Sequence, residues 1–496
     1  MPPQLGLLRG FATGLISIAN YVSSHAPNVE VNILDLSEAS SNGLHNEINQ
    51  SIRKTTGKLF VGITTTTGSY QSALKTARVF KEIAPDCVVI FGGHHASADA
   101  ETVLKRHPEE VDFVVIGEGE IPIVELLRNY PDVHAVPGLA YLEGNEFFEN
   151  QPAPLLERRI LDTLPITFRG NGLHSSPGKF EHVTYVSARG CPLHCSFCSV
   201  ADQPMRTKSP QRVKQDIREL VEMGFRKIAI EDNFFAHSFA RTTEVCVALR
   251  ELREELGNVF SWDCQTRVES MTVTGIVPLM ESAGCEAVYI GVESLNEDSL
   301  LYLGKTIHPA RYLAQLLDIV IPRLLDSNID CYLNIQFGIP QEKSEHYDRT
   351  YQVLKRIAEL ANSKGKVVTI FPQLFVIYPG TNHFKEGIKK GLFKAEVFES
   401  FTKWEMEEEP IRVWLGEYFA HGVGGLPIGI LEASKIPLEK YIINPAKVAE
   451  VDAMIRRIED IRGLKVFHYG SYLTTGDTDQ TDNRQTSRDK TLLEDR

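Results

Sequence analysis

Short apolar runs and amphipathic stretches alternate along the first quarter of the chain. They predict helices at residues 5–25 and 69–83, and strands at 29–34, 59–64, 87–91 and 112–116. The later strands are continuous apolar runs, and each ends in a turn of small residues. Continuous apolar strands that alternate with helices indicate a parallel sheet covered on both faces. Such sheets bind ligands beyond the carboxyl ends of their strands.

A second series of strand and helix signals fills residues 181–385. It predicts strands at 182–187, 227–230, 260–264, 287–291, 330–337 and 367–376, with helices near 244–256 and 311–326, near 347–360, and before Gly284. The helix after the first strand has clear ends, with Ser209 as N-cap, Pro210 as first residue and Gly224 as stop. Six such units predict a partial (β/α) barrel, whose site lies at the carboxyl ends of the strands.

The stretches between and after these two series have a different composition. Residues 126–180 are rich in proline and carry a hairpin signal around Gly144 and Asn145. Beyond about residue 390 come an acidic run at Trp404 and a glycine-rich stretch at His421. We therefore predict an α/β domain at 1–125, a connector at 126–180, the barrel at 181–388, a C-terminal region that selects the substrate at 389–472, and a disordered tail at 473–496.

Composition narrows the class of protein. The chain has 496 residues, and its apolar share of 43% and charged share of 24% are ordinary for globular proteins. A net charge of −13 argues against a nucleic-acid partner. No apolar run approaches the ~20 residues that span a bilayer, and the start has no signal-peptide pattern. Five of the eight cysteines are scattered in apolar surroundings, which suits buried thiols in a reducing cytoplasm.

The other three cysteines carry the strongest chemical signal. Cys191, Cys195 and Cys198 form a C-x3-C-x2-C run directly after the first predicted barrel strand. Thiolates hold iron–sulfur clusters, and three of them leave one iron of a 4Fe-4S cluster open for a small molecule. A structural zinc knuckle or three buried thiols is the alternative. Structural zinc usually takes four protein ligands, and no fourth cysteine follows before Cys246.

The cysteine run resembles that of radical S-adenosylmethionine (SAM) enzymes. The resemblance implies that the open iron binds the amino and carboxylate groups of SAM. One electron from the cluster then cleaves SAM to a 5'-deoxyadenosyl radical. It also implies a small-molecule substrate and an electron donor such as flavodoxin or ferredoxin.

The first domain resembles the cobalamin-binding domain that precedes many radical SAM enzymes. The resemblance rests on the segments Val61–Thr64, Phe91–Ser97 and Val115–Glu120. It implies a flavodoxin-like fold and a cobalamin held by Thr64, Gly92, Gly93, Gly117, Glu118 and Gly119.

Two features depart from that pattern. The chain begins where the first strand of such a domain should already have ended, so the first strand is expected to be missing. The Asp-x-His-x-x-Gly motif that supplies a cobalt-binding histidine is absent, and His94 and His95 do not fit it. The resemblance then implies cobalamin bound without a protein histidine, or a domain that has lost its cofactor.

Polar residues that break the apolar runs at the barrel strand ends are the candidates for contacts with SAM. The resemblance implies contacts from Phe197, Glu231, Asp232, Gln265, Arg267, Glu293 and Ser294. Either Glu231 or Asp232 accepts from the SAM ammonium group, because a carboxylate accepts hydrogen bonds from a charged donor. Arg267 holds the carboxylate of SAM or a substrate anion, or else forms a structural ion pair.

The last three candidates have implied roles on the other side of SAM. Glu293 accepts from the ribose, whereas Ser294 contacts it or caps the next helix. Phe197 presents its backbone to adenine and shields the cluster.

The sequence therefore predicts a cobalamin-dependent radical SAM enzyme. The resemblance most favours methylation of an unactivated carbon, or of phosphorus, in a small molecule or natural product. Cyclisation, rearrangement or carbon–carbon coupling by the same radical chemistry is the first alternative. A non-catalytic cobalamin- or redox-sensing module is the second, and a simple iron–sulfur electron carrier is the third.

Overall fold

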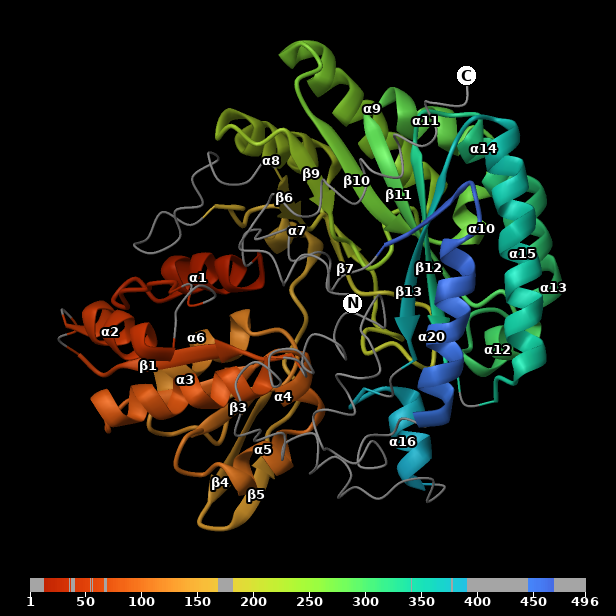
Figure 1. Ribbon diagram of the computed structural model, residues 1–496. Coiled ribbons are helices and arrows are strands. Elements are labelled where there is room, and N and C mark those ends of the chain that lie inside the picture. Colours follow the sequence, from red (N-terminus) through yellow and green to blue (C-terminus); the bar gives the residue numbers. More distant parts are fainter. Residues whose placement is uncertain are drawn as a thin grey trace.

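The computed structural model describes residues 13–167 apart from 35, 37–40, 54, 56, 67 and 68, residues 182–389 apart from 340, 376 and 377, and residues 445–467. Two α/β parts, each with its own sheet, lie side by side (Figure 1). The predictions at Met1, Trp404, His421 and the C-terminal tail lie outside these residues.

The first part is built on a five-stranded sheet in the order β1-β2-β3-β4-β5. Its strands are β1 (Phe60–Thr64), β2 (Val88–Gly92), β3 (Phe113–Val115), β4 (Leu139–Glu143) and β5 (Glu146–Glu149). Its helices are α1 (Thr13–His25), α2 (Ser41–Ile52), α3 (Tyr70–Ile83), α4 (His94–Ala98), α5 (Ala100–Arg106) and α6 (Glu120–Asn129). Strands β1 to β3 are parallel, and the predicted hairpin β4–β5 adds two antiparallel strands to them.

The strand predicted at 29–34 is wrong, because this segment has no backbone partner in the described sheet. Its alternation is nevertheless real, since Ile33 is buried in the core and its neighbours Asn32 and Leu34 are exposed. In the doubly wound order 2-1-3-4-5 this segment would pair only with a strand that precedes α1. The described residues contain no such strand, so the segment packs through its side chains alone.

The second part is a seven-stranded parallel sheet in the order β14-β13-β12-β11-β10-β9-β6, which confirms the predicted partial barrel. Its strands are β6 (His182–Tyr185), β9 (Lys227–Ile230), β10 (Ser261–Thr266), β11 (Cys285–Glu293), β12 (Asp330–Phe337), β13 (Val368–Leu374) and β14 (Leu464–Val466). The hydrophobic pattern does not predict strand β14, because its three residues are too few to show a period.

Helices follow or flank the strands of this sheet (Figure 1). They are α8 (Pro210–Glu222), α9 (Phe239–Leu256), α10 (Val268–Met271), α11 (Ile276–Ser282), α12 (Glu297–Tyr302), α13 (Pro309–Gln315), the π-helical turn η1 (Leu316–Val320), α14 (Ile321–Leu325), α15 (Ser344–Ser363), α16 (Asn382–Lys389) and α20 (Pro445–Glu459). Ser209 caps α8 as predicted, accepting from the backbone N–H of Arg212 at 3.2 Å. The single helix predicted near 311–326 is interrupted by η1, because Pro322 has no N–H to donate back to Asp318.

Helix α1 joins the two parts of the molecule. Ile16 and Ala19 pack into the core of the barrel, and Val22 packs against Val124 of α6. Asn20 donates to the carbonyl oxygens of Pro165 and Thr167 in the connector, both at 3.0 Å. One face of α1 is thus buried by each part, which fixes how the two parts meet.

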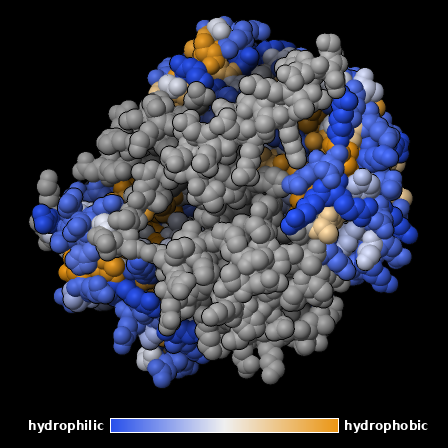
Figure 2. All heavy atoms as spheres, in the orientation of Figure 1, coloured by the Kyte–Doolittle hydropathy of each residue, from blue (hydrophilic) through white to orange (hydrophobic). Residues whose placement is uncertain are grey.

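The outer flanks of both parts are mostly hydrophilic where the described surface is visible (Figure 2). Among the described helices, none combines the length and apolar character needed to cross a bilayer.

A buried ion-pair group supports β6, the strand that precedes the cysteine run. Asp216 of α8 is fully buried, and its carboxylate lies 2.8 Å from Lys208 Nζ and 2.7 Å from Arg212 Nε. It also accepts a 2.9 Å hydrogen bond from the hydroxyl of Tyr185 in β6.

Replacing Asp216 by Ala leaves two cations without their partner. We expect Asp216→Ala to lower the free energy of unfolding by about 3–5 kcal/mol.

Urea unfolding measured by circular dichroism tests this expectation. Asp318→Ala is the matched control, because Asp318 forms an exposed pair with Arg356. We expect it to cost less than about 1 kcal/mol. Equal destabilisation by both substitutions would contradict the role given to Asp216.

Candidate functional site

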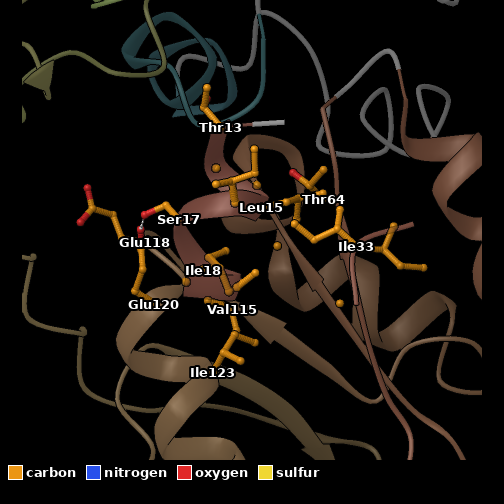
Figure 3. Close-up of a pocket in the computed structure, with 18 of the residues that line it drawn as sticks. Thr13, Leu15, Ser17, Ile18, Ile33, Thr64, Val115, Glu118, Glu120 and Ile123 are labelled. Atoms are coloured by element: carbon orange, nitrogen blue, oxygen red, sulfur yellow. Dashed lines mark hydrogen bonds between the residues drawn. The ribbon is translucent and has the colours of Figure 1, made fainter. Parts of the chain in front are cut away.

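A cavity of about 1910 Å³ lies between the two parts and is lined by residues of both. Its walls include the carboxyl ends of β1, β2 and β3, the inner face of α1, and the residues that flank the cysteine run. Figure 3 shows Leu15 and Ile18 of α1 together with Thr64 and Val115 of the strand ends around this space. Pockets for drug-sized ligands occupy roughly 300–1000 Å³. The volume therefore suits a much larger ligand, or two ligands together.

Two hydroxyls, the buried one of Thr65 and the half-buried one of Ser97, tie the strand ends of the first part together. Thr65 donates from Oγ1 to the carbonyl of Gly92 at 2.8 Å and accepts from the N–H of Ala96 at 3.1 Å. Ser97 donates to the carbonyl of Val115 at 3.3 Å and accepts from the N–H of Gly117 at 3.1 Å. Neither residue was predicted. Each belongs to a small-residue turn, but nothing in the sequence distinguishes it from its neighbours.

All six residues predicted for cobalamin line this cavity: Thr64, Gly92, Gly93, Gly117, Glu118 and Gly119. Gly93 has a φ of +90°, and a Cβ there would lie 2.5 Å from the carbonyl oxygen of Thr65. Gly117 has a φ of +89° and no atom within 4 Å of where its Cβ would be. The turns at Gly93 and Gly117 expose backbone without side chains to a large cavity, so they leave room for a bulky cofactor. The contacts themselves stay a prediction.

The neighbouring residues His94 and His95 lie in different surroundings. His94 lines the cavity. His95 is 2% exposed and packs against Tyr70 with ring centroids 4.3 Å apart, and burial lowers the pKa of His95 to about 4. His95 is therefore a core residue.

The cysteine run forms a loop closed at its base by a short two-stranded ribbon. Strand β7 (Ala188–Arg189) pairs antiparallel with β8 (Arg206–Thr207). Gly190, with a φ of +85°, allows the loop to start, because a Cβ there would lie 2.3 Å from the carbonyl oxygen of Pro204. The loop begins and ends at fixed positions, so its thiols are presented from a defined base.

The middle of the loop is held at Ser196, between two of the cysteines. Its N–H donates to the carbonyl of Leu303 at 3.0 Å and its hydroxyl donates to that of Tyr302 at 3.1 Å. From the other side, the N–H of His383 donates to the carbonyl of Ser196 at 3.0 Å, and its Nε2 lies 2.8 Å from the Ser196 hydroxyl. Phe197 packs against Leu303 in the same region.

The three thiols are free and lie in this one loop, with Cys191 and Cys195 buried. Burial raises the pKa values of Cys191 and Cys198, and the neighbouring thiols raise them further. The described residues contain no group of three His, Cys, Asp or Glu side chains that could hold one metal ion. A four-iron cluster binds each thiolate at a separate iron, so it does not need the three sulfurs around one point. The donor set fits the cluster, and the three ligands stay predictions.

Arg267 lies directly against this loop. Its Nη1 is 3.4 Å from Cys195 Sγ, and its Nη2 donates to the carbonyl of Lys305 at 2.5 Å and to Glu269 Oε1 at 3.0 Å. The arginine thus forms an ion pair with Glu269, and its role toward SAM stays a prediction. Its contact with Cys195 also places a cation beside a predicted ligand.

The two carboxylates at the end of β9 have different surroundings. Asp232 is fully buried and accepts from the N–H groups of Ser187 and Ala188 at 2.6 and 2.8 Å and from the Ser187 hydroxyl at 2.5 Å. Asp232 therefore supports the backbone that leads into the cysteine loop. Glu231 instead lines the cavity, and its Oε1 has no hydrogen-bond partner. Of the two candidates, Glu231 is the one free to accept from a ligand.

The remaining predicted SAM contacts cluster further around the barrel. Gln265 donates to Glu231 Oε2 at 3.3 Å. Glu293 accepts from Lys305 Nζ at 3.2 Å and from Gln336 Nε2 at 2.7 Å. Ser294 accepts at 3.2 Å from the N–H of Asn296, the N-cap residue of α12. Their roles toward SAM stay predictions.

The structure also joins charged residues of the two parts, and no pattern along the chain predicts these pairs. Glu118 accepts from Arg206 Nη2 at 2.6 Å and lies 3.3 Å from Arg189 Nη1. Burial alone would raise the pKa of Glu118, but the two arginines lower it below its usual value. Glu120 accepts from Arg189 Nη2 at 2.7 Å and from the Ser17 hydroxyl at 2.6 Å, the contact drawn in Figure 3.

Two protein-family models match the chain in the order of its two parts. The model "B12 binding domain" matches residues 9–127, and the model "Radical SAM superfamily" matches residues 185–354. The first match contains the cavity-facing strand ends. The second contains the cysteine loop and strands β9 to β12.

Curated relatives and a solved structure share this architecture. The chain is 27% identical over 352 residues to "Uncharacterized methyltransferase PH0819" of Pyrococcus horikoshii, covering 69% of this chain and 72% of that protein. It is 28% identical over 319 residues to the anaerobic magnesium-protoporphyrin IX monomethyl ester cyclase of Rubrivivax gelatinosus, covering 60% of this chain and 54% of the cyclase. The fold is similar to that of OxsB, described as a cobalamin-dependent S-adenosylmethionine radical enzyme, with a TM-score of 0.60 and 13% identity, covering 97% of this chain and 81% of OxsB.

The surroundings of Glu231 predict a pH dependence of stability. Burial, followed by the charge of Asp263, raises the pKa of Glu231 to about 8. In an unfolded chain a glutamate titrates near ~4.3. Between these values the folded protein keeps a proton that the unfolded chain has lost. The contribution of Glu231 to stability is therefore present at low pH, is lost as pH rises through this window, and stays lost above about pH 8.

Glu231→Gln should remove this contribution to the pH dependence. We expect the variant to gain stability relative to the wild type as pH rises between about pH 5 and about pH 9, measured by urea unfolding. Glu101→Gln, at an exposed glutamate of α5, is the matched control. If the free energy of unfolding depends on pH in the same way in the wild type and in Glu231→Gln, the raised pKa assigned to Glu231 is wrong.

Proposed function

Because the chain belongs to the radical SAM superfamily and carries a B12-binding domain in front of its radical SAM domain, we propose that it methylates an unactivated carbon, or phosphorus, of a small-molecule substrate. A 4Fe-4S cluster, SAM and cobalamin are the cofactors that these two domains imply. PH0819, whose name describes a methyltransferase, supports methyl transfer as the reaction.

One observation supports the proposal above the others. The predicted cobalamin contacts and the entry to the cysteine loop face the same cavity, since Gly117 and Gly190 both line it. When bound, the cluster with SAM supplies hydrogen-abstracting radical chemistry and cobalamin supplies methyl-transfer chemistry. A substrate between them would lie within reach of both.

The chain's own residues bind, orient and shield in this proposal. The three cysteines hold the cluster, and Phe197, with its apolar neighbours Leu303 and Ile339, keeps water from one side of it. Glu231 offers an unpartnered oxygen to the ammonium group of SAM. The glycine turns at Gly93 and Gly117 let the corrin approach the backbone. The charge-assisted hydrogen bond between the SAM ammonium group and Glu231 contributes roughly 1.5–3 kcal/mol to binding.

The physiological partners belong to the same proposal. The cluster needs a one-electron donor such as flavodoxin or ferredoxin. All eight cysteines are free thiols, which supports a reducing, cytoplasmic location.

Replacing Cys191, Cys195 and Cys198 together by Ala tests the cluster site. After anaerobic reconstitution with iron and sulfide, we expect the wild type to absorb near about 400 nm and to cleave SAM to 5'-deoxyadenosine. The triple variant should lose both properties, because no other described residues supply three thiols in one loop. The variant Cys87→Ala, at a buried thiol of the first part, is the control. SAM cleavage retained by the triple variant would refute the site.

A second candidate function is radical cyclisation without methyl transfer. The relative from Rubrivivax gelatinosus is named as a cyclase and matches over 319 residues.

Product mass separates methylation from cyclisation, because methylation adds one CH2. We expect the protein reconstituted with hydroxocobalamin and SAM to add CD3 from labelled SAM to a compound in an extract of its host. A product of unchanged or lower mass that carries no label would favour cyclisation.

A further inference from the structure

The ribbon at the base of the cysteine loop places two like charges opposite each other. Arg189 of β7 is the direct cross-strand partner of Arg206 in β8. Like charges at opposed positions destabilise a strand pair. The ribbon is only two residues long on each side, so it has little backbone pairing to offset this repulsion.

Two carboxylates from the first part neutralise these arginines. Glu118 binds Arg206 in a fork, with oxygen–nitrogen distances of 2.6 and 2.9 Å. Glu120 is 3% exposed and binds Arg189 at 2.7 Å. Bidentate arginine–carboxylate pairs fix geometry as well as charge. We call Ser17, Glu118, Glu120, Arg189 and Arg206 the interdomain ion-pair cluster.

The members of this cluster lie next to both predicted cofactor sites. Arg189 is two residues before Cys191, and Glu118 and Glu120 flank Gly119 in the turn after β3. Ser17 completes the contact from α1, donating to Glu120 and accepting from Arg189 Nη2 at 2.8 Å. Figure 3 shows Ser17, Glu118 and Glu120 gathered at one wall of the cavity.

We propose that Arg189 is a positioning residue that sets the distance between the cysteine loop and the cofactor-facing turn of the first part. The interdomain ion-pair cluster makes the base of the loop depend on the first part, since its two arginines repel each other without Glu118 and Glu120. Consequences for catalysis rest on the proposed function, but the contact itself does not.

The first arm of the test needs no cofactor. Hydrogen–deuterium exchange is measured on the full-length apo chain for Arg189→Met, Arg189→Lys and Glu120→Gln. We expect Arg189→Met and Glu120→Gln to speed exchange by about tenfold or more in both residues 117–127 and 182–190. Arg189→Met leaves the buried charge of Glu120 without its cation, and Glu120→Gln removes the shorter of the two carboxylate contacts of Arg189. Arg189→Lys keeps the charge and should fall between Arg189→Met and the wild type. Arg356→Met, which removes an exposed ion pair of α15, is the matched control and should change neither segment.

The second arm measures the separation of the cofactors directly. The wild type is reconstituted with cluster and cobalamin, and the dipolar broadening between the reduced cluster and Co(II) is recorded by electron paramagnetic resonance. We expect Glu120→Gln and Arg189→Met to retain iron and cobalt but to show a weaker interaction, with partial rescue in Arg189→Lys. Glu120→Gln carries the test if Arg189→Met loses iron, because Glu120 lies far from the cysteines in sequence.

The outcomes separate this proposal from the proposed function. Faster exchange confined to residues 182–190 would mean that Arg189 only supports its own ribbon, and would overturn the proposal. An unchanged dipolar interaction in Glu120→Gln would overturn it as well. A wild type that binds no cobalamin would refute the proposed function, while the exchange arm would still decide whether the interdomain contact holds the loop.

Discussion

A charge-balanced contact between the two parts of the molecule is the constraint on which the rest of the site depends. The cysteine loop itself contains little regular structure, and its base is a ribbon of two residues a side. Its geometry is imposed from outside the loop. Glu118 and Glu120 hold the base, and Tyr302 and His383 hold the middle by binding Ser196. A loop fixed in this way can present three thiols in one orientation to the cavity. The first part thus supports the cysteine loop of the second part, in addition to providing the predicted cobalamin contacts.

Carboxylates around the same cavity are held in opposite states by their surroundings. Glu118 faces two arginines, and their charges lower its pKa despite burial. Burial, followed by the charge of Asp263, raises the pKa of Glu231 to about 8. Its side-chain hydrogen-bond partner is the neutral amide of Gln265, which brings no positive charge to offset the burial. Desolvation disfavours the charged form, and a nearby opposite charge restores it. Residue type alone does not separate the carboxylate that joins the two parts from the one that is left free for a ligand.

Much of the fold could be predicted from the sequence, because the apolar runs are long and well delimited. Strand β12 has the predicted bounds 330–337, and Ser209 caps α8 as expected. The strand predicted at 29–34 is wrong because alternation reports side-chain burial, whereas a strand also needs a backbone partner. Strand β14 was missed because three residues give no periodicity. The C-x3-C-x2-C run was informative on its own, because its ligands are adjacent in sequence. Arg189, Thr65 and Ser97 act through partners tens of residues away, and that pairing exists only in the folded chain.

Quantitative metal analysis of protein purified and reconstituted without oxygen tests the central claim most directly. The account predicts about four iron atoms and one cobalt atom per chain, since one cluster lies in the cysteine loop and one corrin beyond the strand ends of the first part. Zinc in place of iron would contradict the cluster, and iron without cobalt after incubation with hydroxocobalamin would contradict the role of the first part.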